Sequence, residues 1–503
     1  MKLASRLIVI IAAVSIATTS AFAAPKYKAD VPESLLTPDK VQSEYLGDLE
    51  FFDGFPKEET IEKSYKFLDV MHAVQLFELG MPTSSMYAML NGHRQIGVKP
   101  NLSIGITEQL FDARSLWLTP NTTTPYIHGE VDVKDGPVVI EIGSPIIGIL
   151  DDAWFKYVGD LGLGGPDKGK GGKYLVVGHD YDGEIPEGYF VLKTNTYRHW
   201  LLIRAVGKPG EPLSETLKAF KRGFKMYPLA DAKKPRENKY INLSGKKYNT
   251  IHATNAEIYS ELNAAIQYEP ANSGNPEMLG LARSIGILKG QPFEPDQRMR
   301  KLLDEAAKIG NAAFRSVMYK PRNKSAYFYP DRQWFSPLAA GSYEFLDENG
   351  ARSLDDMVGF HFYATGVTPF MVSPQVGAGS VYEIGSTDLQ GRPLDGGKIY
   401  TVTLPGPVPA KDFWSFMAYD NHTRSILETD QQSGGIDSKR DGMNVASDGS
   451  VTIYFGPEAP QGQENNWVQT VPGKGYNVLL RLYGPLQPWF DKSWKPSDFI
   501  PVE

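Results

Sequence analysis

Apolar positions recur at helical spacing in the first part of the chain. Between residues 58 and 79 an apolar or aromatic side chain returns every three or four positions, at Ile61, Tyr65, Leu68, His72 and Leu76. This period predicts a helix with one apolar stripe, which Gly80-Met81-Pro82 ends. Thr83 or Ser84 would cap a second helix that runs to about Leu90. Residues 24–57 are rich in proline and charge and predict an extended arm.

A different pattern begins near residue 115 and continues to residue 204. Short runs of Val, Ile and Tyr alternate with Gly, Pro and Asp, and the clearest runs span 138–142, 174–177, 189–192 and 200–204. Such punctuation is typical of an antiparallel sandwich or barrel. The glycine-dense tract 159–173 predicts a long loop within this region.

Helical periodicity returns between residues 211 and 320, and strands dominate again from residue 343. Helices are expected at 213–224, 255–267 and 298–319. Strands are expected at 400–404, 413–419, 451–455 and 476–482. Asp448-Gly449 is typical of a tight hairpin turn.

Together these segments predict an α+β fold, mainly β, with two antiparallel β-sandwich (jelly-roll-like) domains joined by a helical segment. A chain of 503 residues exceeds the roughly 250–300 residues at which a single core stops growing, so more than one domain is expected. The expected parts are a signal peptide at 1–23, an N-terminal arm and helices at 24–110, a first β-sandwich domain at 111–207, a helical connecting region at 208–335 and a C-terminal β-sandwich domain at 336–503.

The first 23 residues have the pattern of a secretory signal peptide. Lys2 and Arg6 form a positively charged region before an apolar run from Leu7 to Ala17. Ala21-Phe22-Ala23 then gives the small-x-small site that a signal peptidase accepts. The run is about half the roughly 20 residues needed to span a bilayer. We therefore expect a periplasmic or secreted protein with no membrane insertion after cleavage.

Composition narrows the chemistry. The chain has no cysteine, which excludes disulfides, thiol nucleophiles and thiolate metal sites. A net charge of −7 without a basic run argues against nucleic-acid partners. The eight histidines show no metal-ligand spacing, so we predict no metal and no cofactor. A metal site assembled from distant histidines and carboxylates is the alternative, and a homo-oligomer is compatible with the sequence.

Catalytic motifs match only weakly. Gly164-x-x-x-x-Gly169-Lys170 follows most of a phosphate-binding loop, but Gly171 stands where Ser or Thr should bind magnesium, and a strand pattern follows. Ser244-x-x-Lys247 matches a Ser–Lys nucleophile pattern inside a lysine-rich loop. No Gly-x-Ser-x-Gly elbow is present. None of these motifs predicts an activity.

One polar strand face is more informative. In residues 124–131 a period of two places Thr124, Tyr126, His128 and Glu130 on the same face. An ordinary half-buried strand with its polar face in water is the first interpretation. The second is that Tyr126, His128 and Glu130 line a ligand cleft, with His128 between the other two as an acid or base near neutral pH.

A second polar group follows the strand at 413–420. This strand is apolar on both faces until Asp420, which predicts a central strand covered on both sides. Asp420 and Arg424 could form a structural ion pair. Alternatively, Asp420, His422 and Arg424 orient a ligand at the strand end, facing the same cleft as the first group.

Tryptophans near turns and prolines have two interpretations. Trp334, Trp467, Trp489 and Trp494 could stack on sugar rings if exposed. Packing within the core or between domains is the alternative that we favour.

Several strings resemble a known family. In order, these are Phe413-Trp414-Ser415, Tyr419-Asp420, Asp448-Gly449-Ser450, Asn466-Trp467 and Arg481-Leu482-Tyr483-Gly484-Pro485. They closely resemble domain of unknown function 1214. Upstream, Asn121-x-x-Thr124-x-Tyr126, the run 174–178 and Pro186-x-Gly188 resemble its N-terminal partner, domain of unknown function 1254. The resemblance implies an exported bacterial protein with two β-sandwich domains, and it assigns no catalytic residue.

We therefore expect an exported protein that binds a small or glycan-like ligand between two β domains. The candidate ligand-binding residues are Tyr126, His128, Glu130, Asp420, His422 and Arg424. A hydrolase or lyase that uses His and carboxylates is one alternative. A structural envelope protein whose aromatic residues serve assembly is another, and a large apolar surface would favour it.

Overall fold

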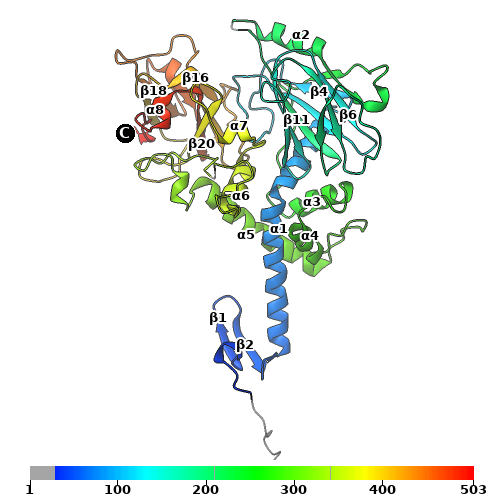
Figure 1. Cartoon of the computed structure of the whole chain (residues 1–503). Helices are drawn as coiled ribbons and strands as arrows, with labels where there is room; N and C mark the ends of the chain where they lie inside the picture. The colour runs from blue at the N-terminus through cyan, green and yellow to red at the C-terminus, as the bar shows by residue number, and fades with distance from the viewer. Residues whose placement is uncertain (1–28, 209, 340, 503) are drawn as a thin grey trace, which may run out of the picture. The chain divides into compact units, whose positions relative to one another are not determined.

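The computed structural model describes residues 29–208, 210–339 and 341–502, so the signal peptide expected at 1–23 lies outside the described residues. The chain divides into two compact units, one up to Phe67 and one from Leu68 onward. Figure 1 shows the elements with their labels.

The first unit contains a small sheet where the sequence predicted an extended arm. Its elements are the short 3-10 helix Glu33–Leu35, strands β1 (Lys40–Ser43), β2 (Gly47–Phe52) and β3 (Phe55–Pro56), and the start of helix α1 (Glu58–Gln95). The strands pair in the order β1-β2-β3, and both pairs are antiparallel. Gly47 at the start of β2 and Gly54 in the turn before β3 have positive φ, a conformation that glycine adopts without strain. The sequence pattern predicted an extended arm here and did not predict these strands.

Large apolar side chains of this unit are exposed. Tyr45 is 81% exposed and Phe52 is 78% exposed, and Tyr65 in the first part of α1 is 66% exposed. Tyr65 belongs to the apolar stripe expected on this helix. Leu76, a later member of the same stripe, is fully buried in the second unit. The helical period is therefore confirmed, but only part of the stripe is a core face.

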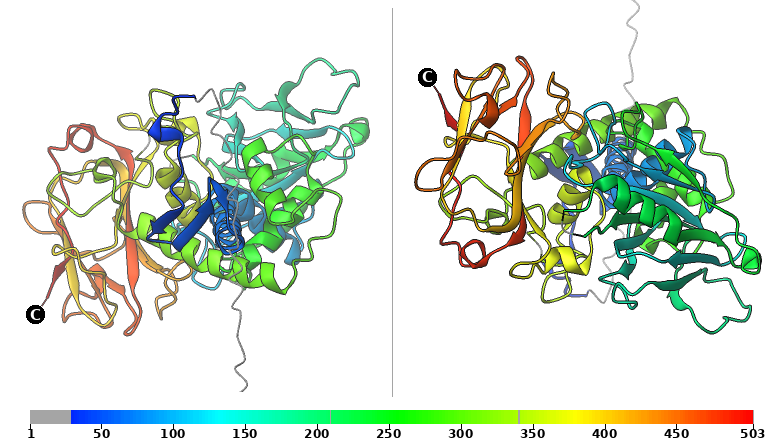
Figure 2. Two further views of the ribbon diagram at one scale, coloured as in Figure 1. Left: turned by 90° about the horizontal axis from the view of Figure 1, so that it is seen from below. Right: turned by 90° about the horizontal axis from the view of Figure 1, so that it is seen from above.

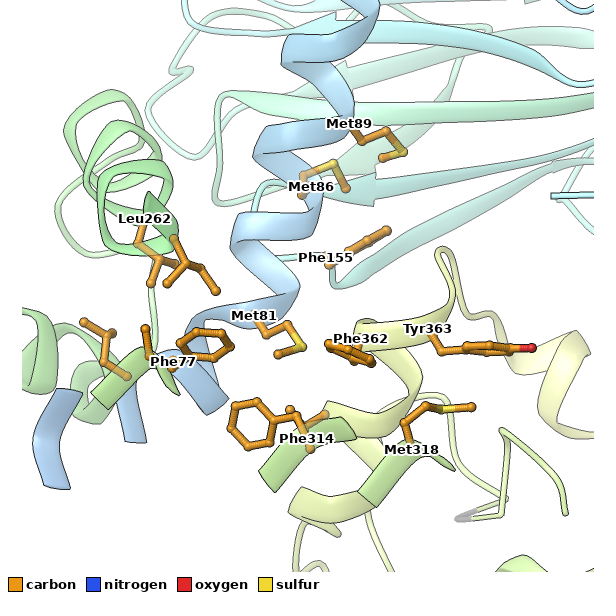
Figure 3. Close-up of a cluster of buried hydrophobic side chains, with 14 of the residues drawn as sticks. Phe77, Met81, Met86, Met89, Phe155, Leu262, Phe314, Met318, Phe362 and Tyr363 are labelled. Atoms are coloured by element: carbon orange, nitrogen blue, oxygen red, sulfur yellow. The ribbon is translucent and has the colours of Figure 1, made fainter. Parts of the chain in front are cut away.

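Helix α1 continues through Pro82, so the expected stop at Gly80-Met81-Pro82 was wrong. Proline inside a helix has no N–H to donate to the preceding turn, at a cost of roughly 3 kcal/mol. Tertiary packing offsets this cost, because Met81, Met86 and Met89 are buried in the largest core cluster. Figure 3 shows these side chains with Leu262, Phe155, Phe314 and Phe362 around them.

The N-terminal β module (residues 103–242) contains two sheets. The six-stranded sheet has the order β13-β4-β5-β11-β7-β8, and the four-stranded sheet has the order β10-β9-β6-β12. The strands are β4 (Ser103–Ile106), β5 (Ile127–Asp132), β6 (Val138–Ile142), β7 (Ile146–Asp152), β8 (Tyr157–Gly162), β9 (Gly172–Val177), β10 (Phe190–Lys193), β11 (Arg198–Ala205), β12 (Phe224–Pro228) and β13 (Lys239–Asn242). The pairs β13–β4 and β10–β9 are parallel, so the sheets are mixed and not purely antiparallel as expected.

Helices occupy the middle of the chain. They are α2 (Leu213–Gly223), α3 (Glu257–Tyr268), α4 (Pro276–Ser284), α5 (Gln297–Tyr319), α6 (Leu354–Tyr363) and α7 (Pro369–Val372). The side chains of Asn275 and Asp296 cap α4 and α5 by accepting hydrogen bonds from backbone N–H groups. In both views of Figure 2, green-to-yellow helical segments lie between the two groups of strands of the second unit. A helical connecting region between the two β modules stays a prediction.

The C-terminal β module (residues 380–501) also contains two four-stranded sheets, with orders β14-β20-β16-β17 and β19-β18-β15-β21. The strands are β14 (Ser380–Gly385), β15 (Tyr400–Leu404), β16 (Ala410–Asp420), β17 (Gly435–Asp437), β18 (Val451–Gly456), β19 (Trp467–Gln469), β20 (Tyr476–Pro485) and β21 (Ile500–Pro501). The short helix α8 (Gln487–Phe490) lies between β20 and β21. Strand β16 lies between β20 and β17 and is buried from Phe413 to Asp420, which confirms the predicted central strand.

The molecule is therefore an α+β protein with several mixed and antiparallel sheets. One core cluster of the C-terminal module combines Val402 and Ile453 of one sheet with Phe416 and Leu480 of the other. Trp334, Trp489 and Trp494 are buried, which confirms that these tryptophans serve packing. Within the described ranges, no helix is both long enough and apolar enough to cross a bilayer.

Candidate functional site

The predicted polar strand face lies on β5 and continues on its neighbour β11. In the antiparallel register Glu130 pairs with Trp200 and His128 pairs with Leu202. Tyr126 directly precedes β5, so the same face continues from Tyr126 to Arg204 on the neighbouring strand. The side chains of the predicted group therefore share one face but differ in their surroundings.

Glu130 forms a buried ion pair with a helix residue. Its carboxylate is 2% exposed and accepts from Nε of Arg94 at 2.7 Å and from Nη2 of the same guanidinium. Burial raises the pKa of Glu130, and the Arg94 guanidinium opposes this rise. Arg198 lies at 3.8 Å from the same carboxylate. These contacts fasten α1 to β5 and satisfy the charge of Glu130.

His128 is fully buried among aromatic rings. Trp200 Nε1 donates to His128 Nδ1 at 3.2 Å, and the imidazole stacks on Tyr126 with centroids 5.8 Å apart. Burial lowers the pKa of His128 well below its usual value, so the ring is neutral near pH 7. Among the hydrogen bonds of the described residues, none joins His128 to Tyr126 or Glu130. The expected acid–base role of His128 stays a prediction.

The second predicted group separates into three different environments. Asp420 forms an ion pair with Lys474 Nζ at 2.5 Å and accepts from the backbone N–H of His422 at 2.7 Å. Arg424 is buried, and its guanidinium donates to the carbonyl oxygens of Phe362 and His422. The His422 side chain is exposed. The structural ion pair expected between Asp420 and Arg424 was therefore wrong, because Lys474 takes the carboxylate and backbone carbonyls take the guanidinium.

A different cluster of side chains brings the two β modules together. We call it the Arg–Tyr cluster, and its members are Tyr126, Arg204, Tyr382, Tyr419, Arg481 and Tyr483. In the C-terminal module Arg481 of β20 pairs with Tyr382 of β14 on one side and with Ser415 of β16 on the other. Tyr483 follows two residues later on the same face and stacks on Phe413, with centroids 4.0 Å apart.

The loop that precedes β5 lies directly against this sheet face. Arg481 Nη2 donates to the carbonyl oxygen of Thr119 at 3.0 Å, and Tyr419 donates to the carbonyl oxygen of Pro120 at 2.7 Å. The hydroxyl oxygens of Thr123 and Tyr483 lie 3.4 Å apart. Residues 119–124 of the N-terminal module therefore contact the sheet β14-β20-β16-β17 at the Arg–Tyr cluster.

Two buried polar atoms lack hydrogen-bond partners here, one in the Arg–Tyr cluster and one on the strand beside it. Arg481 is 3% exposed and Ser415 is fully buried, yet within the part of the chain that the structure describes neither Arg481 Nη1 nor Ser415 Oγ has a partner. The two residues are directly opposite each other in the register of β16 and β20. Buried polar groups are normally paired, so this pair of orphaned atoms indicates a place where a further polar group binds.

The positive charge of the cluster also lacks acidic partners. Arg204 donates to Thr124 Oγ1, and its Cζ lies 4.4 Å from the centroid of the Tyr126 ring. Arg481 donates to Tyr419 Oη at 2.8 Å. Among the described residues, neither guanidinium forms an ion pair with Asp or Glu, unlike Arg94. Two cations therefore share a largely buried location with hydroxyl groups and the carbonyl oxygen of Thr119, and no carboxylate of the described residues pairs with them.

The tyrosines and arginines shift one another's protonation. Burial lowers the pKa of Arg204 and Arg481, but the neighbouring tyrosines outweigh burial and raise the pKa of both guanidinium groups. Burial raises the pKa of Tyr126, but Arg204 and Arg481 outweigh it and hold the pKa below its usual value. Tyr126 and Tyr483 raise the pKa of both arginines, so the two guanidinium groups have these two tyrosines in common as neighbours.

Asn121 fixes the orientation of the Tyr126 hydroxyl group. The side-chain Oδ1 of Asn121 accepts from the backbone N–H of Thr123 and of Thr124, both at 2.9 Å. The amide nitrogen Nδ2 therefore points the other way and donates to Tyr126 Oη at 2.9 Å, and the Asn121 backbone N–H donates to the same oxygen at 3.2 Å. Tyr126 Oη accepts two hydrogen bonds.

Of the six residues that the sequence predicted, Tyr126 alone belongs to the Arg–Tyr cluster. The sequence reasoning missed Arg204, Arg481 and Ser415 as site residues. One signal could have found some of the cluster, because the family-like strings contain Asn121, Thr124, Tyr126, Ser415, Tyr419, Arg481 and Tyr483. A shared cleft between the Tyr126 group and the Asp420 group stays a prediction.

The weak motifs form ordinary loops. Asp167 organises the glycine-dense segment by accepting from the N–H groups of Gly162 and Gly171 at 2.8 and 3.0 Å, and β9 follows, as the sequence predicted. Ser244 Oγ donates to the carbonyl oxygen of Leu110 at 2.7 Å. In the described part of the chain, no three His, Asp or Glu side chains are grouped to hold a metal ion.

Comparison with known proteins identifies both β modules. The family model of the protein of unknown function DUF1254 matches residues 103–228, and that of the protein of unknown function DUF1214 matches residues 379–487. No curated protein matches the chain. All members of the Arg–Tyr cluster lie within the two matched segments.

Two crystal structures are similar to this chain. One is of a Vibrio parahaemolyticus protein, with 16% identity and a TM-score of 0.50, over 86% of this chain and 100% of that chain. The other is of an uncharacterized protein from Burkholderia cenocepacia, with 11% identity and a TM-score of 0.39, over 88% of this chain and 97% of that chain. The first of these likenesses shows a shared fold alone.

Proposed function

The chain carries the domains of unknown function 1254 and 1214 in that order, and on this premise we propose that it is an exported protein that binds a small anionic, glycan-like ligand at the Arg–Tyr cluster. The observation that carries the proposal is the buried guanidinium of Arg481, whose Nη1 has no partner in the described structure and whose charge has no acidic counterpart. A ligand anion would supply both the missing hydrogen-bond acceptor and the missing negative charge.

The energetics of buried charge favour a ligand at this position. An isolated charge away from water is costly unless it is paired and hydrogen-bonded. Arg94 meets this requirement with Glu130, and Asp420 meets it with Lys474. Arg204 and Arg481 do not meet it within the described chain. A carboxylate, phosphate or sulfate group would complete the site, because guanidinium groups bind such oxyanions through two parallel hydrogen bonds.

The surrounding side chains suit a ligand that also carries hydroxyl groups. Thr123, Thr124, Tyr382 and Tyr483 are half-buried and surround the two guanidinium groups. Hydroxyl groups both donate and accept hydrogen bonds, and tyrosine rings offer flat faces for sugar rings. An acidic sugar combines an anionic group with hydroxyls, and we infer that this is the ligand class.

The other parts of the proposal concern location and architecture. Export is supported by the sequence pattern of residues 1–23 and by the absence of cysteine. We also propose that each pair of sheets packs as a β-sandwich. In the C-terminal module this is supported by one core cluster that combines side chains of both sheets.

A structural role in the cell envelope is a second candidate. The exposed Tyr45, Phe52 and Phe55 of the first unit favour it, because exposed apolar side chains in one small region often mark an assembly surface. Light scattering of the full chain and of a Tyr45→Ser/Phe52→Ser variant distinguishes the candidates. An oligomer that the variant loses supports assembly, and a monomer in both samples excludes it.

Calorimetric titration tests the ligand proposal. Inorganic phosphate, inorganic sulfate and a galacturonate oligosaccharide are titrated into the wild-type protein and into Arg481→Met. We expect binding that salt weakens, and a loss of at least about 10-fold in affinity in Arg481→Met, because a charge-assisted contact is removed. Arg236→Met is the matched control, since Arg236 lies on the surface with Asp231. Equal affinity in all three proteins, or no binding of any of the three anions, would sink the proposal.

A further inference from the structure

The hydroxyl group of Tyr126 is arranged as a proton acceptor. Its oxygen accepts hydrogen bonds from the backbone N–H and from Nδ2 of Asn121. Among the hydrogen bonds of residues 29–208, 210–339 and 341–502, none has the Tyr126 hydroxyl group as the donor. Two N–H donors on one phenol oxygen stabilise the phenolate more than the phenol.

The two unpaired arginines act in the same direction. The Arg204 guanidinium lies over the Tyr126 ring, with Cζ 4.4 Å from the ring centroid. Arg204 and Arg481 outweigh burial and keep the pKa of Tyr126 below its ordinary value. A tyrosine that loses its proton more readily than usual is suited to acid–base chemistry.

We propose that Tyr126 is the proton-transfer residue of the Arg–Tyr cluster and takes a proton from the carbon beside the carboxylate of a bound acidic sugar. This inference rests on the proposed function, because it requires an anionic ligand next to Arg204 and Arg481. It adds a reaction class, β-elimination, to the proposed binding.

The reaction balances with the groups at the site. The phenolate oxygen of Tyr126 forms an O–H bond as the C–H bond beside the carboxylate breaks. The electron pair of that bond forms a C=C bond, and the C–O bond to the neighbouring sugar breaks. The leaving oxygen takes the proton from Tyr126, which regenerates the phenolate. Arg481 and Arg204 stabilise the negative charge that grows on the carboxylate during proton removal.

His128 and Asn121 would support this chemistry without contacting the ligand. The imidazole of His128 stacks on the Tyr126 ring and holds its orientation, and because it is neutral it leaves the stabilisation of the phenolate to Arg204 and Arg481. Asn121 is a positioning residue, since its Oδ1 is held by Thr123 and Thr124 while its nitrogen atoms face Tyr126. Replacement of Asn121 by Asp would remove one donor and place a negative charge beside the phenol.

Ultraviolet titration of the tyrosines tests the first step without knowledge of the substrate. Wild-type protein should show a phenolate signal that appears at lower pH than the main tyrosine transition. Tyr126→Phe should lose this early signal, whereas Tyr45→Phe, which removes an exposed tyrosine, should keep it. Asn121→Asp should move the early signal to higher pH. If wild type and Tyr126→Phe titrate identically, Tyr126 is an ordinary phenol and the inference is wrong.

Inorganic phosphate separates this inference from the proposed function. An anion bound beside Tyr126 disfavours the phenolate, so phosphate should move the early signal to higher pH in wild type but not in Arg481→Met. An early signal that phosphate does not move contradicts anion binding at the cluster. An absent early signal in a protein that binds phosphate contradicts the proton-transfer role alone.

Elimination itself is followed through the ultraviolet absorbance of the unsaturated product. With galacturonate, glucuronate and mannuronate oligosaccharides as substrates, Tyr126→Phe should lower turnover by at least about 100-fold while it keeps the affinity for the oligosaccharide. Arg481→Met should lose affinity as well. Absence of an unsaturated product from all three wild-type reactions overturns the elimination step.

Discussion

The two faces of the sheet β14-β20-β16-β17 differ sharply in composition and in environment. One face holds Trp414, Phe416, Leu480 and Leu482 in the core of the C-terminal module, and each is at most 4% exposed. The opposite face holds Ser415, Arg481 and Tyr483 against the N-terminal module. Successive residues of the same two strands alternate between the faces. The family-like string Arg481-Leu482-Tyr483 therefore places side chains on both faces of the sheet.

This difference teaches how to distinguish residues that build the fold from residues that serve the site. Apolar residues on the core face are fully surrounded by partners. The face toward the N-terminal module is equally buried at Ser415 and Arg481, yet each has a polar atom without a partner in the described residues. Burial alone therefore does not mark a structural residue. Incomplete bonding points to a ligand where, as at Arg481, it coincides with a buried cation that has no acidic partner in the described residues.

Removal of the largest side chain on the core face should have the largest effect on stability. Trp414→Ala leaves a cavity in a packed cluster and should lower the free energy of unfolding by about 3–5 kcal/mol. Denaturant unfolding followed by circular dichroism measures this loss. Tyr483→Phe on the other face is the control and should cost far less. A loss below about 1 kcal/mol in Trp414→Ala would mean that the residue is exposed and serves another role.

The core face also contains one buried acid whose protonation should make stability depend on pH. Glu383 accepts from Tyr329 Oη at 3.1 Å and from Trp489 Nε1 at 2.6 Å, and burial raises its pKa to about 7. Because the folded pKa is higher than the unfolded one, the folded state binds more protons between about pH 4.5 and 7. Stability should therefore fall as pH rises through this window.

Glu383→Gln should remove this dependence, because the amide accepts the same bonds without charge. At pH 8 the variant should be more stable than wild type by on the order of 3 kcal/mol, and at pH 4 the two should differ little. Denaturant unfolding across this pH range gives the comparison. Parallel pH profiles of the two proteins would show that Glu383 does not titrate in this window.

Replacement of the unpaired cation on the opposite face should have the smallest effect on stability. Arg481→Met loses bonds to Thr119 and Tyr419 but also removes a buried charge without an acidic partner. These effects oppose each other, so the free energy of unfolding should change by about 1 kcal/mol or less. If Arg481→Met loses about 3 kcal/mol or more, Arg481 is a structural residue and the contrast between the faces fails.

The sequence predicted the central strands of the fold well. It failed where contacts between residues far apart in the chain determine the structure. Strand β15 has the predicted bounds, and β16, β18 and β20 extend the predicted runs by a few residues. Helix α5 begins one residue before its predicted start. The continuous α1 was missed, because local rules end a helix near Pro82 and the burial of Met81 is not visible in the sequence. Parallel pairing of β4 with β13 involves segments more than a hundred residues apart.

The site was predicted only in part for a related reason. A period of two placed Tyr126 on a polar face correctly, but it could not show that α1 covers Glu130 with Arg94. Arg481 lies in a strand with apolar neighbours, where an arginine suggests an ion pair. Its significance depends on the partners it lacks, and these appear only in three dimensions. Such incomplete bonding has no signature in a single sequence.

The central claim is that an anion completes the bonding of Arg481 and Ser415, and a crystal structure of the protein purified from its native compartment tests it most directly. We predict density for an oxyanion whose oxygens lie about 2.7–3.2 Å from Arg481 Nη1 and Ser415 Oγ, with Arg204 facing the same group. Density at this position should disappear in crystals of Arg481→Met. A wild-type structure in which these atoms bond to protein groups, with Arg481 paired to an Asp or Glu of the chain, would contradict the account.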